Sequence, residues 1–205
     1  ATRSDRITVM VTPPQNTPPV VTAQIPMPLT MPANSSLTVL LENLMVTDPD
    51  NTYPDDFTLA LSPGSNYVLD GVDTIVPDSD FEGLLNVAVT VNDGIVGSNS
   101  YALSVFVGEV IYVSSTASGE PLDGSGCGTR TPCYETIQAG IDAAAARPQG
   151  SFTLMRTAAD TYHESPVFAT SGQLFLDGGW TDDFDTKTKN DVVIDSGSLP
   201  VSFTR

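Results

Sequence analysis

The chain of 205 residues is long enough for one or two domains with buried cores, and its composition, 40% hydrophobic and 16% charged, is that of a globular protein. No apolar run approaches the roughly 20 residues that a membrane-spanning helix needs, so membrane insertion is not expected. The formal net charge is -17, and no Lys or Arg occurs between Arg6 and Arg130, which makes nucleic acid a poor partner.

The first predicted element is a strand at the N-terminus. Arg6–Val11 matches Ala102–Val107 at a constant offset of 96 residues (103 − 7), about the length of one sandwich domain. Residues 1–15 are therefore interpreted as the last strand of a preceding repeat, or a strand donated to another chain, followed by a Pro-rich linker. A chance match of two short apolar runs is the alternative. The strand would donate three alternating apolar residues, Ile7, Val9 and Val11.

Residues 16–108 are predicted to form a β-sandwich, because short apolar runs alternate with turn residues and no helical pattern competes. In the last two runs alternate residues are apolar, so each strand should have one buried face. The clearest runs are Ser36–Leu41, Phe57–Leu61, Leu84–Val91 and Tyr101–Val107.

A different pattern occupies residues 109–205. A strand at Ile111–Val113 and a Gly-rich loop precede the one good helix candidate, Thr136–Ala146, which has a threonine N-cap and Pro148 beyond its end. Short strands at regular spacing after one amphipathic helix predict the capped start of a parallel β-helix. The strand runs are Phe152–Met155, Val167–Ala169, Leu174–Leu176, Val192–Ile194 and Val201–Phe203.

The only two cysteines, Cys127 and Cys133, lie in the Gly-rich loop before this helix. No second pair of Cys or His ligands accompanies them, so a local disulfide is predicted in preference to a structural zinc site. A disulfide implies an oxidising compartment.

Both halves resemble known families. The first resembles the cadherin-like tandem repeats of large bacterial adhesins, and the second is similar to the N-terminal part of right-handed β-helix, pectate-lyase-like surface proteins. This resemblance implies an all-β fold, in which an Ig/cadherin-like β-sandwich is followed by a short parallel β-helix segment with one capping α-helix. The motifs are Asn16–Pro19, Thr47–Asn51 and Thr90–Gly94 in the first half, and Ile111–Ser114, Thr136–Ala144, Thr161–Tyr162 and Asp177–Trp180 in the second.

The cadherin-like resemblance also implies a calcium site at one pole of the sandwich. Its ligands would be Asp48, Asp50, Asn51, Asp93 and Asn16. Calcium takes roughly six to eight hard oxygens in a loose shell, which loop carboxylates and amides provide. The alternatives are that these residues form ordinary turns and that the acidity only keeps the protein soluble.

Catalytic residues are not expected. His163, the only histidine, follows Asp160 by three residues, and no nucleophile elbow accompanies them. Acidic residues around Trp180 could suggest a polysaccharide lyase or a glycosidase, but structural turns are the preferred interpretation. Trp180 itself would be a core cap or, alternatively, a sugar-stacking platform. These acids are Asp177, Asp182, Asp183 and Asp185.

The sequence therefore predicts a non-catalytic structural or adhesive module of a large surface adhesin or self-assembling fibre, located outside the cell or on its surface. Its expected partners are copies of itself or adjacent repeats of a longer chain, with cell-surface glycans as a further class. One alternative is a subunit that polymerises by donating its N-terminal strand. Another is the spacer and N-terminal portion of a carbohydrate-active β-helix enzyme.

Overall fold

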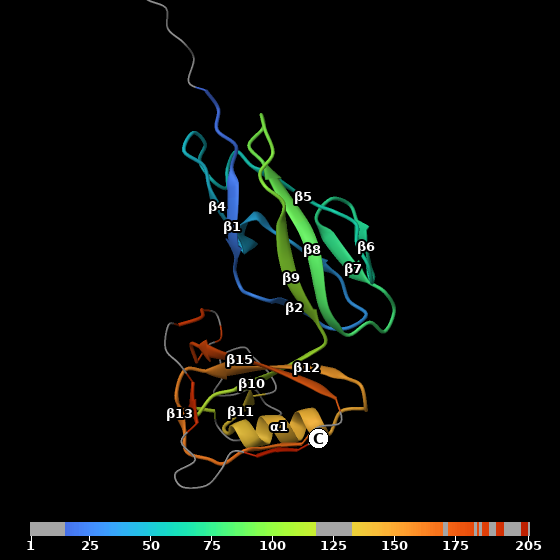
Figure 1. The fold of residues 1–205 in the computed structure, drawn as a ribbon, viewed down its shortest axis with the longest axis vertical. Helices are drawn as coiled ribbons and strands as arrows, with labels where there is room; N and C mark the ends of the chain where they lie inside the picture. The colour runs from blue at the N-terminus through green and yellow to red at the C-terminus, as the bar shows by residue number, and fades with distance from the viewer. Residues whose placement is uncertain are drawn as a thin grey trace, which may run out of the picture.

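A computed structural model describes residues 15–117, 133–169, 172–182, 184, 186–188, 192–194 and 202–204. Over these residues the chain is mostly β-strand, with one α-helix (Figure 1). This confirms the all-β class. The predicted N-terminal strand, with Ile7, Val9 and Val11, falls outside the described residues, as does Cys127.

Nine strands form the first half. They make a four-stranded sheet of order β2-β9-β8-β5, a three-stranded sheet of order β3-β7-β6 and a β1-β4 pair. Only β2 and β9 pair in parallel, and the other pairs are antiparallel. The strands are β1 (Val20–Gln24), β2 (Leu29–Met31), β3 (Leu37–Thr38), β4 (Leu44–Thr47), β5 (Thr58–Leu61), β6 (Tyr67–Asp70), β7 (Thr74–Pro77), β8 (Gly83–Asn92) and β9 (Tyr101–Val107).

One hydrophobic core lies between these sheets. On β8 every second residue from Leu85 to Val91 is at most 2% exposed, and on β9 Leu103, Val105 and Val107 are fully buried. Residues from β1, β2, β4, β5, β6 and β7 complete the core. The period-two pattern that predicted one buried face is confirmed on β8. On β9 the predicted face is buried, and Phe106 on the opposite face is fully buried as well.

The strand expected over Ser36–Leu41 is shorter than predicted. Only Leu37 and Thr38 pair in β3, and a short 3-10 helix follows at Leu41–Asn43. The side chain of Asn43 accepts a hydrogen bond from the Leu40 amide at 2.8 Å. This local bond satisfies backbone that a strand neighbour would otherwise bind, so the strand ends.

In the second half, three short strands recur in the same order. β12, β13 and β14 pair in parallel with β15, β16 and β17 respectively, and β10 pairs in parallel with β12. The second-half elements are β10 (Glu109–Val113), β11 (Cys133–Tyr134), α1 (Ile137–Ala145), β12 (Phe152–Ala158), β13 (Thr161–Tyr162), β14 (Val167–Ala169), β15 (Gln173–Trp180), β16 (Val193–Ile194) and β17 (Ser202–Thr204).

Helix α1 closes one side of this second half. Its buried residues Ile137, Ile141 and Ala144 pack against Ile111 of β10 and Met155 of β12. The Thr136 hydroxyl accepts a hydrogen bond from the Ala139 amide, as expected of the N-cap. The helix therefore lies within one residue of its predicted bounds at each end.

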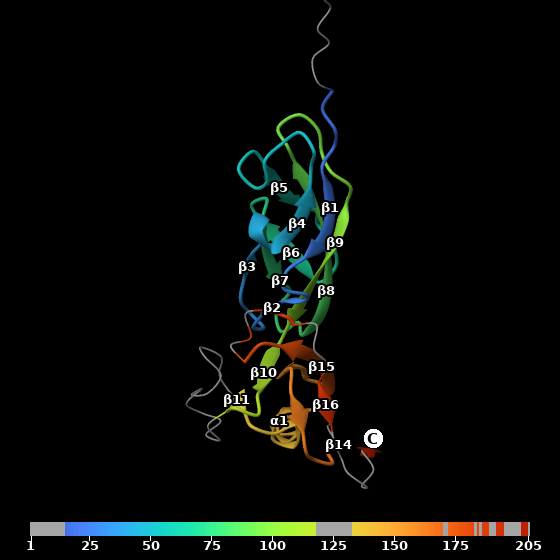
Figure 2. The same ribbon diagram turned by 90° about the vertical axis from the view of Figure 1, so that its left-hand side faces the viewer.

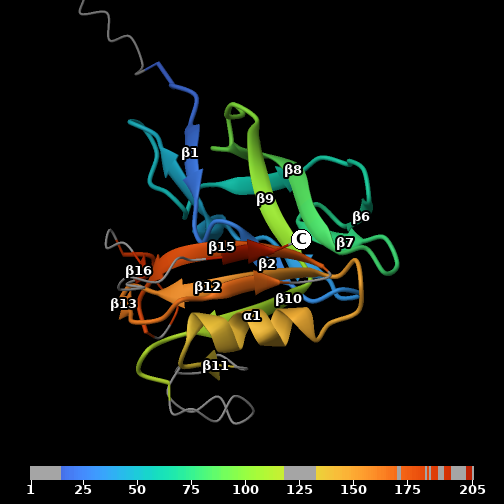
Figure 3. The ribbon, with the colours of Figure 1, turned by 60° about the horizontal axis from the view of Figure 1, so that its bottom comes forward.

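The two halves follow one another end to end (Figures 1 and 2). Gly108 is the single residue between β9 of the first half and β10 of the second. The parallel sheet of β10, β12 and β15 lies between the first half and α1 (Figure 3). In the described part of the chain, no helix has the length and apolar character to cross a membrane.

Candidate functional sites

The predicted calcium ligands lie at the end of the first half that points away from the second half. The loops after β4 and after β8 meet there, next to the chain entering β1 (Figure 1). We call this region, which contains Asn16, Asp48, Asp50, Asn51 and Asp93, the acidic pole.

Hydrogen bonds at the acidic pole fasten the entering chain to both loops. The Asn16 side chain donates to Asp93 Oδ2 at 2.9 Å, and the Thr17 amide donates to Asp50 Oδ2 at 2.7 Å. Asp48 Oδ1 accepts from the amides of Asp50 and Asn51 at 2.8 and 3.0 Å. Asn16 thus meets Asp93 directly, and its neighbour Thr17 meets Asp50.

Asp93 is the most buried residue of the acidic pole, with only 4% of the residue exposed. Its Oδ1 accepts from the amides of Ile95 and Val96 at 2.8 and 2.7 Å. The Val96 amide, followed by the Asn16 side chain, lowers the pKa of Asp93, because these donors favour the charged carboxylate.

The acidic pole differs from a preformed metal cage. Among the residues that the structure describes, no group of three or more His, Cys, Asp or Glu side chains is placed to hold a metal ion. Asp48 Oδ2 is nevertheless buried and has no hydrogen-bond partner in the described chain. Such an atom is available to a cation that would add backbone or water oxygens to its shell.

A second candidate site is a groove of about 650 Å³ at the junction of the two halves. Its first-half wall is the segment Gln24–Pro28 with Leu84 and Phe106, and its second-half wall includes Phe175, Leu176 and Trp180. The wall is largely apolar, and Met27 and Leu176 are 59% and 53% exposed. We call this feature the junction groove.

A charged cluster lies at one end of the junction groove. Asp177 accepts a hydrogen bond from Trp180 Nε1 at 3.1 Å and pairs with Lys187, and its Oδ2 is 3.6 Å from Arg156 Nε. The Arg156 guanidinium lies over the Trp180 ring, 4.2 Å from its centroid. Trp180 is only 2% exposed, so it is a packed core residue rather than a surface platform for sugars.

Two other acids considered for catalysis, Asp182 and Asp160, have structural contacts. Asp182 accepts a hydrogen bond from the Ser114 hydroxyl at 2.9 Å. Asp160 accepts from Ser115 and from the Thr161 amide, and the Ser115 hydroxyl is the largest cause of the lowered pKa of Asp160, with His163 a smaller one. Asp183 and Asp185 lie outside the described residues.

The disulfide stays a prediction. Cys127 is outside the described residues, and only the backbone of Cys133, in β11, is described. The contact between Arg156 and Pro28 at the junction was not predicted from the sequence, because it joins positions 128 residues apart and no local pattern marks it.

Comparison with known proteins does not assign the chain. No family model matches it, and no curated protein and no solved structure shows significant similarity to it.

Proposed function

We propose that this chain is a non-catalytic structural module of a larger extracellular adhesin or fibre, made of a cadherin-like sandwich followed by the first turns of a right-handed parallel β-helix. The observation that carries the proposal is the recurrence of β12, β13 and β14 as β15, β16 and β17, each in parallel register with its counterpart. A chain that repeats three strands per turn and stacks each on its predecessor builds a solenoid.

The end-to-end placement of the two halves supports a spacer role, because modules joined in line extend a chain away from a surface (Figure 2). The structural contacts of two acids considered for catalysis, Asp177 and Asp160, support a non-catalytic role. Asp177 and Asp160 are engaged by Trp180, Lys187, Ser115 and Thr161, which hold them in fixed structural contacts.

Immunogold electron microscopy of cells that express the chain tests this proposal. Antibodies raised against the purified chain should label the cell surface or extracellular fibres. Labelling confined to the cell interior would contradict the proposal. Release of unsaturated or reducing sugars from acidic polysaccharides by the purified chain would instead favour the carbohydrate-active alternative.

Assembly by strand donation is a second candidate, and the outer edge of β15 favours it. β15 is eight residues long and ends its sheet, with no further strand beside it in the described chain. In the first half, β2 pairs only with Val105–Val107 of β9, and the part of β9 before it is less open, because the Gln24 side chain bonds both the amide and the carbonyl of Ser104, at 2.6 and 2.9 Å. An unpaired edge such as that of β15 can accept another strand.

Light scattering of the full chain and of a chain lacking residues 1–11 tests strand donation. If Ile7, Val9 and Val11 are donated, the full chain should form oligomers and the shortened chain should be a monomer. Equal masses for the two chains would rule the mechanism out and leave the structural-module proposal standing.

Calcium binding at the acidic pole is a further part of the proposal, and the buried Asp48 Oδ2 favours it. Binding to the native state alone stabilises it by about 2.7 kcal/mol at a hundredfold excess over Kd. Calcium should therefore raise the Tm of the wild-type chain, and EDTA should reverse the rise. Asp48→Asn should abolish the response. An identical melting curve with calcium and with EDTA would refute the site.

A further inference from the structure

The junction between the two halves is held at two points on one strand, β12. β12 runs along the base of the first half, and Phe152 and Arg156 lie four residues apart on it, which is about 13 Å in an extended strand. Each of these residues bonds to a different part of the first half.

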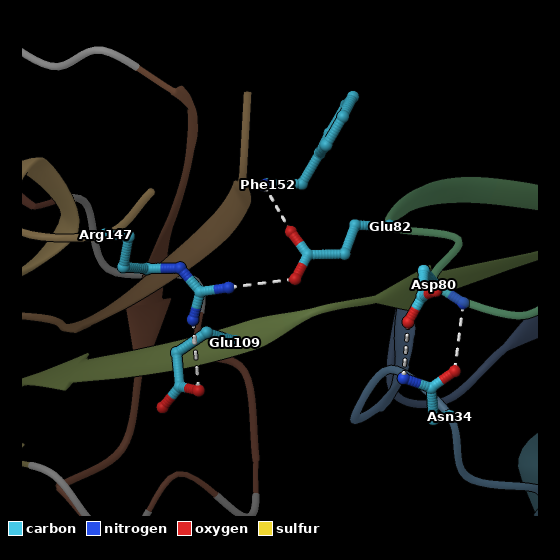
Figure 4. Close-up of polar contacts among 6 residues, drawn as sticks. All are labelled: Asn34, Asp80, Glu82, Glu109, Arg147 and Phe152. Carbon is cyan, nitrogen blue, oxygen red and sulfur yellow. Dashed lines mark hydrogen bonds and ion pairs between the residues drawn. The ribbon is translucent and has the colours of Figure 1, made fainter. Parts of the chain in front are cut away.

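The first contact is made by Glu82, just before β8 (Figure 4). One carboxylate oxygen accepts the Phe152 amide at 2.7 Å, and the other pairs with Arg147 at 3.0 Å. Arg147 also pairs with Glu109 at 3.2 Å. Glu82 and Arg147 side chains are only 24% and 22% exposed, so these charges are partly shielded from solvent.

The loop that carries Glu82 is itself fixed. Asn34 and Asp80 bond reciprocally, with the Asn34 side chain donating to Asp80 Oδ1 at 3.1 Å and the Asp80 amide donating to Asn34 Oδ1 at 2.9 Å (Figure 4). This pair ties the loop after β2 to the loop before β8. The backbone at Glu82 is therefore held by this pair before it and by β8 after it.

The second contact is made by Arg156, whose guanidinium donates to the Pro28 carbonyl at 2.7 Å. Arg156 is 3% exposed and is held in place by the Trp180 ring and by Asp177. Pro28 belongs to the segment between β1 and β2, so this bond is independent of the Glu82 loop.

Aromatic packing fills the space between the two contacts. Phe106 of β9 packs edge-on against Phe175 of β15, with ring centroids 6.0 Å apart. Phe175 also stacks with Phe152, at 6.2 Å. Gly108, the residue between β9 and β10, is also held to the first half, because its amide donates to the Met31 carbonyl at 3.0 Å.

We propose that the junction is rigid, and that Glu82 and Arg156 hold the two halves at one fixed angle so that they tumble and unfold as a single body. A rotation of one half about either contact breaks the other contact and separates Phe106 from Phe175.

Backbone ¹⁵N relaxation and scanning calorimetry on the full chain test whether the junction is rigid. In the wild type both halves should give the same rotational correlation time, and heating should give one transition. Glu82→Ala leaves the Phe152 amide without its acceptor, so the two correlation times should separate and the Tm should fall by about 3–8 °C. Glu82→Gln keeps an oxygen for that amide and should give an intermediate result.

Glu42→Ala is the matched control, because Glu42 is an exposed acid on the 3-10 helix of the same half. It should leave both the correlation times and the transition unchanged. Retained amide chemical shifts within each half of Glu82→Ala would show that each half still folds. Different correlation times in the wild type would overturn the proposal, as would a Glu82→Ala chain that behaves like Glu42→Ala.

Discussion

Asp93 closes a turn and holds a distant segment with the same carboxylate. One oxygen accepts two amides of its own turn, and the other binds Asn16, 77 residues earlier in the chain. Asp93 therefore stabilises the acidic pole through specific hydrogen bonds, which the net charge of the sequence does not reveal. The local bonds are those of the ordinary turn that was the alternative interpretation of Asn92-Asp93-Gly94. Asn16 was expected beside Asp93 as a calcium ligand, and its direct hydrogen bond to Asp93 was not predicted.

The lowered pKa of Asp93 predicts how stability depends on pH. Because the folded pKa is below the ordinary value of 3.8, the carboxylate stabilises the fold above that value and loses this effect as pH falls through the folded pKa. Asp93→Asn should therefore have a lower Tm than the wild type near neutral pH, and the difference should vanish in strong acid. Asp78→Asn, at an exposed acid, is the control. A difference that persists unchanged in acid would mean that charge is not the cause.

Gly140 is a residue whose small size is required by packing. A Cβ placed there would lie 2.6 Å from Met155 Sδ and 2.8 Å from Val113 Cγ2. Gly140→Ala should thus destabilise the fold by about 1–3 kcal/mol, although alanine favours helix by about 1 kcal/mol. Chemical denaturation measures this. Gly97→Ala is the control, because its nearest atoms would be 3.9 Å away, and it should be close to neutral.

At the scale of elements, local signals predicted some structures well and others poorly. α1 was located because its cap, its periodicity and Pro148 all lie within the segment itself. β9 was predicted to the residue because its alternation is regular. β6 and β7 were not singled out, since what defines them is pairing with each other and, for β7, with β3. The parallel pairs of the second half likewise depend on partners at least 20 residues away, which a single strand pattern does not reveal.

Helix α1 begins at a carboxylate supplied from another segment. Glu164 accepts the amides of Ile137 and Gln138 at 2.7 and 2.8 Å, which satisfies two donors of the first turn and places a negative charge at the helix N-terminus. Glu164→Ala should cost about 1–3 kcal/mol of stability and speed hydrogen exchange of these two amides.

Glu135→Ala separates direct bonding from general charge in this experiment. Glu135 is exposed and lies just before the helix, so its removal should cost only about 0.3–1 kcal/mol through the helix dipole. Equal losses for the two variants would show that the hydrogen bonds from Glu164 contribute nothing specific.

At the scale of the whole molecule, the contacts that orient the two halves join residues far apart in sequence. Glu82 meets Phe152 across 70 residues, and Pro28 meets Arg156 across 128. Neither pair belongs to a motif, so sequence analysis could separate two halves but not state how they meet. The junction groove has the same origin, because each of its walls belongs to a different half.

These long-range contacts depend on the absence of a side chain at Gly108. A Cβ there would lie 2.8 Å from the Phe152 carbonyl oxygen and 3.1 Å from the Phe106 ring, and the residue has a φ of 148°. The carbonyl is backbone of β12, so it cannot rotate away as a side chain would. Gly108→Ala should push β12 from β9 and lower the free energy of unfolding by about 2–4 kcal/mol.

Urea unfolding followed by the fluorescence of Trp180, the only tryptophan, measures this loss beside the junction itself. Gly150→Ala is the matched control, since Gly150 has a φ of 87° but nothing within 4 Å of an added Cβ. It should lose only the backbone term of about 1–2 kcal/mol. Equal losses of unfolding free energy in the two variants would show that Gly108 does not relieve crowding at the junction. A larger loss in Gly108→Ala, together with separate tumbling of the two halves, would show that Gly108 sets the angle between them.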